Sequence, residues 1–222
     1  MSESTRLRVG VFGGTFDPVH VGHLTLLHWA RVELKLNELR VVPTGRSWQK
    51  QAAGASSPQR LAMLRLALAA ETAVQIDDRE VRRDGPSYTV DTLTALRREL
   101  GDQIALVLII GSDQLHNLAS WHRYRDLLGL AHIAITQRET VRLSDFPAPV
   151  EALLLQHGAQ TLPDQPSGTI VFFRMPMMPV SATVLRRQLA KGVKPQELVP
   201  PAVLDYIEQH RIYLQHNASE PT

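Results

Sequence analysis

Two histidines, His20 and His23, follow a glycine turn at Gly13 and Gly14 near the start of the chain. The residues before the turn are apolar and read as a buried strand, and a helical pattern begins at about Gly22. A glycine turn lets backbone approach a phosphate closely, and a helix start supplies unpaired N–H groups and a partial positive charge. This order of strand, turn, histidines and helix predicts a binding site for nucleotide phosphates.

Considered alone, the same residues also fit a purely structural role or a metal site. The glycines could only shape a turn, with both histidines solvated at the helix start. His20 and His23 could instead share a helical face that binds a metal ion, but no nearby glutamate completes a His-Glu-x-x-His motif and the chain has no cysteine. The turn also differs from the two common phosphate-binding loops, Gly-x-Gly-x-x-Gly and Gly-x-x-x-x-Gly-Lys-Ser/Thr.

Residues 13–23 read Gly-Gly-Thr-Phe-Asp-Pro-Val-His-Val-Gly-His. This string resembles the (H/T)xGH nucleotidyltransferase superfamily and, within it, is most similar to the bacterial nicotinate mononucleotide adenylyltransferases. The resemblance implies that ATP and nicotinate mononucleotide react to give deamido-NAD and pyrophosphate, a step of NAD biosynthesis. It also implies that His20 and His23 are catalytic, and that five neighbours bind nucleotide: Gly13, Gly14, Thr15, Phe16 and Gly22.

A second match covers residues 83–93, which read Arg-x-Gly-Pro-Ser-Tyr-Thr-x-Asp-Thr-Leu. The resemblance implies that the helix starting here faces the pyridine ring of the acceptor through Tyr88 and Thr89. Taken alone, the segment predicts only an ordinary helix start that is capped by Ser87 or Thr89.

The apolar run at residues 104–110 predicts a central parallel strand, and it leads into Gly111 and Asp113. Open α/β sheets bind ligands at the carboxyl ends of such strands, although Asp113 could simply cap the next helix. The resemblance implies that Gly111 and Asp113 belong to the nucleotide site and that Trp121 and His122 line its acceptor end. The family often has Tyr where this chain has His122.

Near the end of the chain, Ser181, Thr183 and Arg186 lie in the string Ser-Ala-Thr-Val-Leu-Arg. Ser181 is a natural N-cap, so this segment predicts a second helix start. A cap followed by a surface charge is the ordinary interpretation. The resemblance implies instead that this helix start binds the ATP phosphates and that Arg186 adds a guanidinium.

Residues 44–57 predict a long loop, and such loops are often functional. The family usually has Pro-Pro-His-Lys here, whereas this chain has Ser-Trp-Gln-Lys at residues 47–50. Only Lys50 matches the family. It could reach the triphosphate or be a solvated loop lysine, and we include it among the expected catalytic residues with His20, His23 and Arg186.

The implied chemistry makes modest demands on the protein. An acceptor phosphate is already an anionic nucleophile, so the enzyme must align it with the α-phosphorus and offset charge on the leaving pyrophosphate. Histidines, a lysine, an arginine and helix starts suit that task. We expect Mg²⁺ to be carried mainly by the ATP phosphates, and we assign no protein ligand to it.

Strands alternate with helices along the whole chain, which predicts a single α/β domain with a doubly wound, parallel, Rossmann-like sheet. The domain is expected to span residues 7–214, between disordered tails at 1–6 and 215–222. Strands are expected at 39–43, 74–76, 104–110, 131–136 and 169–174. Helices are expected at 58–70, from about 87 to 100, at 120–128, within 147–157, from 181 and at 201–209.

Composition narrows the function further. The chain has 222 residues, 44% of them hydrophobic, and a net charge of only +2, and its basic residues are scattered. These features argue against a nucleic-acid surface, and no apolar run is long enough to cross a membrane. The N-terminus lacks an apolar signal sequence, which favours the cytoplasm. A homo-oligomer is compatible with the sequence, which leaves the oligomeric state open.

Three rival functions are also compatible with the sequence. A related adenylyltransferase could use nicotinamide mononucleotide or phosphopantetheine as acceptor. The chain could be a nucleotide-binding module without catalysis, although His20 and His23 are both present. It could also be an RNA-binding relative of class I tRNA synthetases, although it lacks a tRNA-binding appendage and a basic face.

Overall fold

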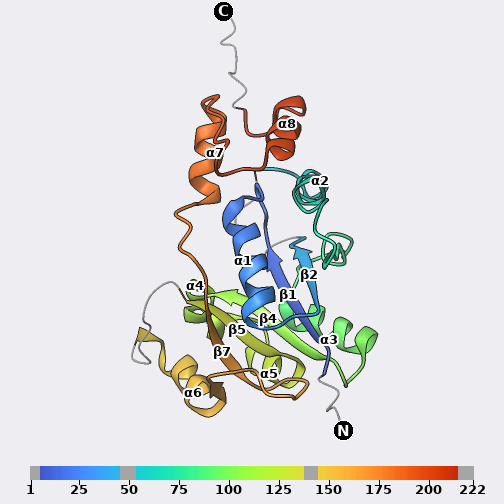
Figure 1. The fold of residues 1–222 in the computed structure, drawn as a ribbon, viewed down its shortest axis with the longest axis vertical. Coiled ribbons are helices and arrows are strands. Elements are labelled where there is room, and N and C mark those ends of the chain that lie inside the picture. The colour runs from blue at the N-terminus through green and yellow to red at the C-terminus, as the bar shows by residue number, and fades with distance from the viewer. Residues whose placement is uncertain (1–5, 46–53, 138–144, 215–222) are drawn as a thin grey trace, which may run out of the picture.

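The computed structural model describes residues 6–45, 54–137 and 145–214 (Figure 1). The sequence predictions for the two ends, and for Lys50 with its neighbours at 47–49, fall wholly or largely outside these residues. Within the described part of the chain, no helix is both long enough and apolar enough to cross a membrane.

The described strands form one parallel sheet in the order β3-β2-β1-β4-β5-β7-β6. The chain builds outward from β1 to β3, then returns to the other side of β1 with β4 and β5, and β7 enters between β5 and the short edge strand β6. This arrangement confirms the predicted doubly wound sheet and places the change of direction between β1 and β4. The strands are β1 (Arg8–Gly14), β2 (Glu38–Pro43), β3 (Val74–Ile76), β4 (Ala105–Gly111), β5 (His132–Gln137), β6 (Gly158–Ala159) and β7 (Ile170–Arg174).

Helices cover both faces of the sheet because the central strands are apolar on both sides. Leu106, Leu108 and Ile110 pack into one core, whereas Val107 and Ile109 pack into the other. Core side chains assign α1, α2, α7 and α8 to the face of Ile109, and α3, α5 and α6 to the face of Leu108. Figure 1 shows α2, α7 and α8 gathered at one end of the molecule. The helices are α1 (Val21–Glu33), α2 (Ser57–Ala67), α3 (Thr89–Leu100), α4 (Ser112–His116), α5 (Leu127–Leu130), α6 (Ala148–His157), α7 (Ala182–Ala190) and α8 (Pro201–Gln209).

The predicted helix at 120–128 is wrong. Two 3₁₀ turns, η1 (Leu118–Ser120) and η2 (Tyr124–Asp126), precede the short helix α5. Arg123 between them has a left-handed backbone with φ of 52°, which an α-helix cannot contain. His122 therefore lies in a turn and not at a helix start.

The caps predicted for α3 are wrong, whereas Ser181 is confirmed as the N-cap residue of α7. Helix α3 begins after Tyr88, whose extended backbone occupies the N-cap position without a side-chain cap. Ser181 occupies the N-cap position of α7, but its side chain makes no capping hydrogen bond. By contrast, Ser56 caps α2 in a capping box with Gln59, which starts that helix one residue earlier than expected.

Candidate active site

A cavity of about 810 Å³ opens at the carboxyl ends of β1 and β4, where the sheet changes direction. It brings together segments that lie far apart in the sequence: the glycine turn, the start of α1, the end of β4 and the start of α7. The predicted residues that line it are Gly13, Gly14, Thr15, Phe16, His20, Gly22, His23, Gly111, Asp113, Ser181, Thr183 and Arg186.

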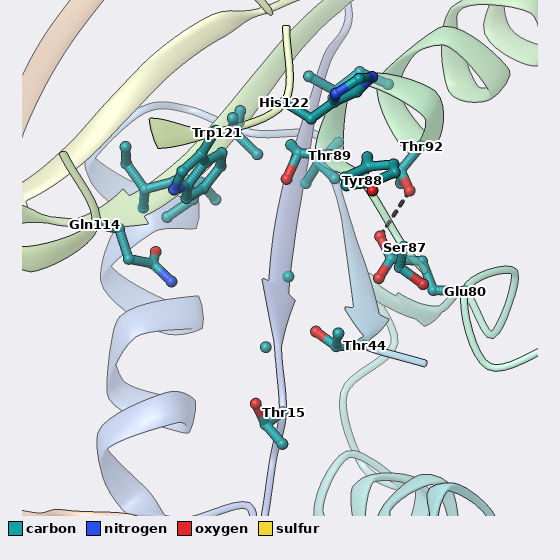
Figure 2. A pocket seen from close by; sticks show the side chains of 17 residues that line it. Thr15, Thr44, Glu80, Ser87, Tyr88, Thr89, Thr92, Gln114, Trp121 and His122 are labelled. Atoms are coloured by element: carbon teal, nitrogen blue, oxygen red, sulfur yellow. Dashed lines mark hydrogen bonds between the residues drawn. The ribbon is translucent and has the colours of Figure 1, made fainter. Parts of the chain in front are cut away.

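A second, smaller pocket of about 120 Å³ shares Gly13, Gly14 and Thr15 with this cavity. It holds the predicted acceptor residues Tyr88, Thr89, Trp121 and His122, which come from the start of α3 and the turns after β4. Figure 2 shows them around the pocket. The glycine turn therefore separates the two spaces and is exposed to both.

Side chains pack closely against two glycines, Gly14 in the turn and Gly22 in the first turn of α1. A Cβ at Gly14 would lie 2.9 Å from the ring of Phe16, which is buried and has a positive φ of 52°. A Cβ at Gly22 would lie 2.6 Å from Val180 and 3.1 Å from the Nδ1 atom of His20. Close packing beside the histidines thus accounts for both glycines.

The two histidines form one unit at the start of α1. His20 is the N-cap residue, and its ring stacks on that of His23 with centroids 3.7 Å apart. The backbone N–H of His20 donates to Nδ1 of His23 at 3.2 Å. Because Nδ1 of His23 accepts this bond, a neutral His23 carries its proton on Nε2.

His20 is less exposed than the sequence suggested, with only 8% of its surface accessible. Burial lowers the pKa of His20 to about 4, because the charged imidazolium loses its hydration. Without ligand, His20 is therefore neutral at pH 7. An anion bound beside it would favour the protonated form.

Arg186 extends from the first turns of α7 toward the glycine turn. Its Nη1 donates to the backbone oxygen of Asp17 at 2.8 Å, and its Nη2 donates to Oγ1 of Thr183 at 3.4 Å. The side chain is 33% exposed and lines the large cavity. This position suits a guanidinium that meets an anionic ligand.

Sequence reasoning missed Arg60, which is 2% exposed although it is charged. It donates to the backbone oxygens of Thr15 and Thr44, each at 2.7 Å, and so ties the end of β1 to the end of β2. Burial lowers the pKa of Arg60, and the nearby carboxylate of Asp17 opposes that shift. The sequence did contain a signal for its burial: Arg60 precedes Leu64 by four residues, so it lies on the same face of α2 as the apolar residues that pack into the core.

In the acceptor pocket, the rings of Tyr88 and His122 lie 4.4 Å apart with an interplanar angle of 33°. Thr89 is the first residue of α3 and lines the pocket. The N-terminal end of this helix, where backbone N–H groups lack helical partners, therefore lies at the pocket. Trp121 lies across the pocket from them (Figure 2).

Sequence reasoning also missed Glu80, which lines this pocket and is 8% exposed. Oγ1 of Thr92 donates to it at 2.7 Å, and burial raises the pKa of the Glu80 carboxyl. The residues next to Glu80 in the sequence did not indicate its burial, because a charged residue after a short strand is typical of a surface loop.

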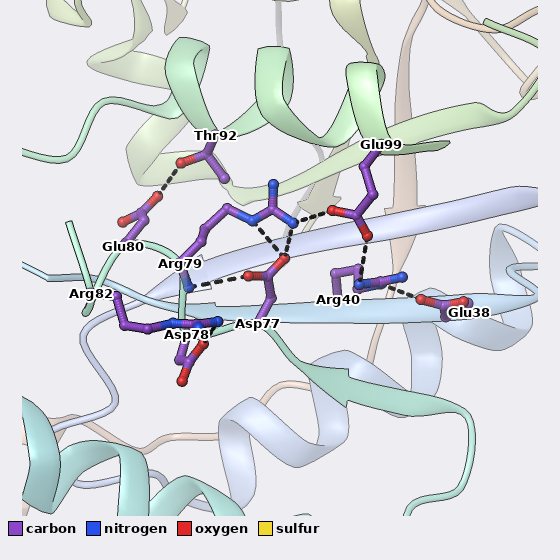
Figure 3. Close-up of polar contacts among 9 residues, drawn as sticks. All are labelled: Glu38, Arg40, Asp77, Asp78, Arg79, Glu80, Arg82, Thr92 and Glu99. Carbon is purple, nitrogen blue, oxygen red and sulfur yellow. Dashed lines mark hydrogen bonds and ion pairs between the residues drawn. The ribbon is translucent and has the colours of Figure 1, made fainter. Parts of the chain in front are cut away.

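An ion-pair network holds the segment that precedes Glu80 (Figure 3). Arg79 pairs with Asp77 at 2.7 Å and with Glu99 of α3 at 2.6 Å, and Glu99 also pairs with Arg40 of β2 at 3.4 Å. The hydrogen bond that Arg79 donates to Asp77 is the main reason that the pKa of Arg79 is raised. The network joins β2, the segment after β3 and α3, and so helps to fix one wall of the pocket.

Comparison with known proteins agrees with this geometry. The cytidylyltransferase-like family profile matches residues 11–188. A protein of Laribacter hongkongensis is 42% identical, with 96% of this chain and 97% of that protein covered. A protein of Cellvibrio japonicus is 44% identical, with 94% and 99% covered. Each is named "Probable nicotinate-nucleotide adenylyltransferase".

A solved structure has the same fold at low sequence identity. It is the Plasmodium falciparum nicotinic acid mononucleotide adenylyltransferase complexed with NaAD, with a TM-score of 0.70 and 17% identity. The alignment covers 94% of this chain and 98% of that one. With the family profile and the relatives above 40% identity, the chain belongs to the cytidylyltransferase-like family and, within it, to the nicotinate-nucleotide adenylyltransferases.

Proposed function

We propose that this chain transfers the adenylyl group of ATP to nicotinate mononucleotide, with one substrate in each of the two adjoining pockets. The observation that carries this arrangement is the glycine turn shared by the pockets, at Gly13, Gly14 and Thr15. ATP in the larger cavity and the acceptor in the smaller pocket would bring their phosphates together at this turn.

In the transfer, an oxygen of the acceptor phosphate forms a bond to the α-phosphorus of ATP. The bond from that phosphorus to the oxygen that bridges to the β-phosphate breaks, and pyrophosphate leaves with the electron pair. No general base is required because the nucleophile is already an anion. The protein aligns the two phosphates and stabilises the charge that moves onto the leaving group.

His20 and His23 are the proposed donors at the reacting phosphates. A neutral His23 carries its donor proton on Nε2, since its Nδ1 accepts a backbone hydrogen bond from His20. Stacking between the rings means that the two side chains hold each other in place. Such fixed donors stabilise transition-state charge without reorganising during the reaction.

The start of α7 is the proposed site for the triphosphate, with Ser181, Thr183 and Arg186 facing the cavity. Lys50 stays a proposed further contact, and it lies outside the described residues. Among the described residues, no group of three or more histidines or carboxylates could hold a metal ion. We expect Mg²⁺ to be held by the ATP phosphates, where the ion would offset negative charge on the departing pyrophosphate.

The pyridine ring of the acceptor is proposed to stack on Trp121, and its carboxylate to face the start of α3 at Thr89. A helix start favours an anion, which supports the acid form of the ring over the amide form. Because His122 lies in a turn, this selectivity depends on Thr89 and the first N–H groups of α3. His122 is proposed to help hold Tyr88 in place at the acceptor pocket, through the contact between their rings.

Product analysis tests the proposal. Purified protein with ATP and Mg²⁺ is given nicotinate mononucleotide, nicotinamide mononucleotide or phosphopantetheine in parallel, and pyrophosphate and the dinucleotide product are measured. Deamido-NAD with the first acceptor is the expected result. If no acceptor drives pyrophosphate release, the proposal fails. Cytoplasmic location stays a prediction, and the oligomeric state stays open.

A further inference from the structure

One buried carboxylate outside the proposed catalytic set joins the glycine turn to two segments that do not line the larger cavity. Asp17, which is 3% exposed, accepts hydrogen bonds from the backbone N–H groups of Gly54 at 2.7 Å and Ala55 at 3.1 Å. The hydroxyl of Tyr213 donates to the same carboxylate at 2.6 Å. The glycine turn, the chain just before α2 and the segment after α8 therefore meet at Asp17.

Asp17 also holds the guanidinium that faces the larger cavity. Nη1 of Arg186 donates to the backbone oxygen of Asp17 at 2.8 Å and lies 3.6 Å from its Oδ2 atom. The hydrogen bond from Arg186 to Thr183 is longer, at 3.4 Å. The direction of the Arg186 guanidinium thus depends on the position of Asp17.

Tyr213 reaches this site from the far end of the described chain. A Cβ at Gly54 would lie 3.0 Å from the Tyr213 ring, so the ring and the backbone at Gly54 are in close contact. Burial raises the pKa of the Tyr213 hydroxyl, and its hydrogen bond to Asp17 adds to the shift. The hydroxyl is therefore protonated and donates to the carboxylate at any ordinary pH.

We propose that Tyr213 is a positioning residue for ATP binding. By donating to Asp17, it fixes that residue and, through it, the direction of Arg186 and the chain at Gly54 and Ala55. Tyr213 does not line the larger cavity itself, and its hydroxyl acts on the site through Asp17. This inference rests on the proposed function for the identity of the nucleotide.

The test is Tyr213→Phe, which removes the hydroxyl and keeps the ring. Tyr206→Phe is the matched control, since Tyr206 lies on α8 and its hydroxyl has no hydrogen-bond partner among the described residues. Affinity is measured by calorimetry with a non-hydrolysable α,β-methylene analogue of ATP. We expect Tyr213→Phe to weaken analogue binding about fivefold or more, as for a lost hydrogen bond to a charged group, and Tyr206→Phe to leave it unchanged.

A loss of stability alone could also weaken binding, so two further measurements separate positioning from folding. Steady-state kinetics should show a raised KM for ATP with the KM for the acceptor changed by less than about twofold. In an Arg186→Ala background, Tyr213→Phe should have a clearly smaller effect on analogue binding, because the part of its action that reaches ATP through Arg186 is already lost.

An undiminished effect of Tyr213→Phe in the Arg186→Ala background would overturn the inference, as would equal effects on both substrates or unchanged analogue binding. Analogue binding needs no acceptor. A protein that binds the analogue but turns over no acceptor would refute the proposed function, while the role of Tyr213 would still be decided by the calorimetry.

Discussion

Arg186→Ala tests the assignment of α7 to ATP. Among the described residues, the side chain has one short hydrogen bond, to the backbone oxygen of Asp17, and its guanidinium lines the larger cavity with 33% of the side chain exposed. A hydrogen bond to a charged ligand group is worth about 1.5–3 kcal/mol, and partial exposure favours the lower part of that range. At about 1.4 kcal/mol for each factor of ten, we expect the KM for ATP to rise about 10- to 30-fold.

The neighbouring residue provides a matched control. Arg187→Ala removes the same charge from the same helix, and Arg187 is exposed and does not line the larger cavity. Pyrophosphate release is followed while ATP and nicotinate mononucleotide are varied in turn. Arg187→Ala should change either KM by less than about threefold, because its charge is solvated. Equal rises in both KM values after Arg186→Ala, or equal effects of the two variants, would refute the assignment.

Three further predictions concern the histidines and the acceptor pocket. Changing either His20 or His23 to Ala should lower kcat by roughly 10²-fold or more, as for the loss of one transition-state donor, and near-normal turnover in either variant would remove it from the catalytic set. The unmodified protein should prefer nicotinate over nicotinamide mononucleotide at least about tenfold in kcat/KM, because a donor left facing the amide costs about 1–3 kcal/mol. Trp121→Ala should then weaken both acceptors alike and Thr89→Val should narrow the preference, whereas equal use of both acceptors by the unmodified protein would show that the pocket is misassigned. Because burial depresses the pKa of His20 to about 4, the unfolded chain binds a proton more readily, and stability is lost as pH falls below the ordinary histidine value. Between pH 7 and pH 5, the free energy of unfolding should fall by roughly 2 kcal/mol less in His20→Gln than in the unmodified protein, as measured by chemical unfolding at each pH. Equal falls in the two proteins would contradict a buried, neutral His20.

Local patterns in the sequence were enough for the order of strands and helices and for the candidate site. The glycine turn before α1, the apolar run of β4 and the start of α7 each depend on neighbours within a few residues, so they can be read from the chain alone. A doubly wound sheet follows from that order, since parallel strands need crossover helices. The carboxyl ends of β1 and β4 then gather the motif residues at one edge of the sheet.

Where local patterns failed, a longer-range contact or an irregular backbone decided the outcome. The helix expected at 120–128 is interrupted at Arg123, which has a left-handed backbone. Arginine is not a residue type from which a left-handed backbone would be predicted. Glu80 is buried beside α3, where Thr92 donates a hydrogen bond to its carboxylate. The residues next to Glu80 in the sequence do not predict this contact.

The sequence by itself determined the family, the fold class and those residues of the larger cavity that lie in the matched motifs, because all of these follow from short strings and their order. Only the tertiary structure decided how those residues are held in place. Tyr213 and Asp17 are separated by 196 positions, and their hydrogen bond exists only because α8 packs against α2 at the end of the sheet. Burial of Arg60 and His20 is likewise a property of the packed core, since a side chain loses its hydration only when distant segments close around it.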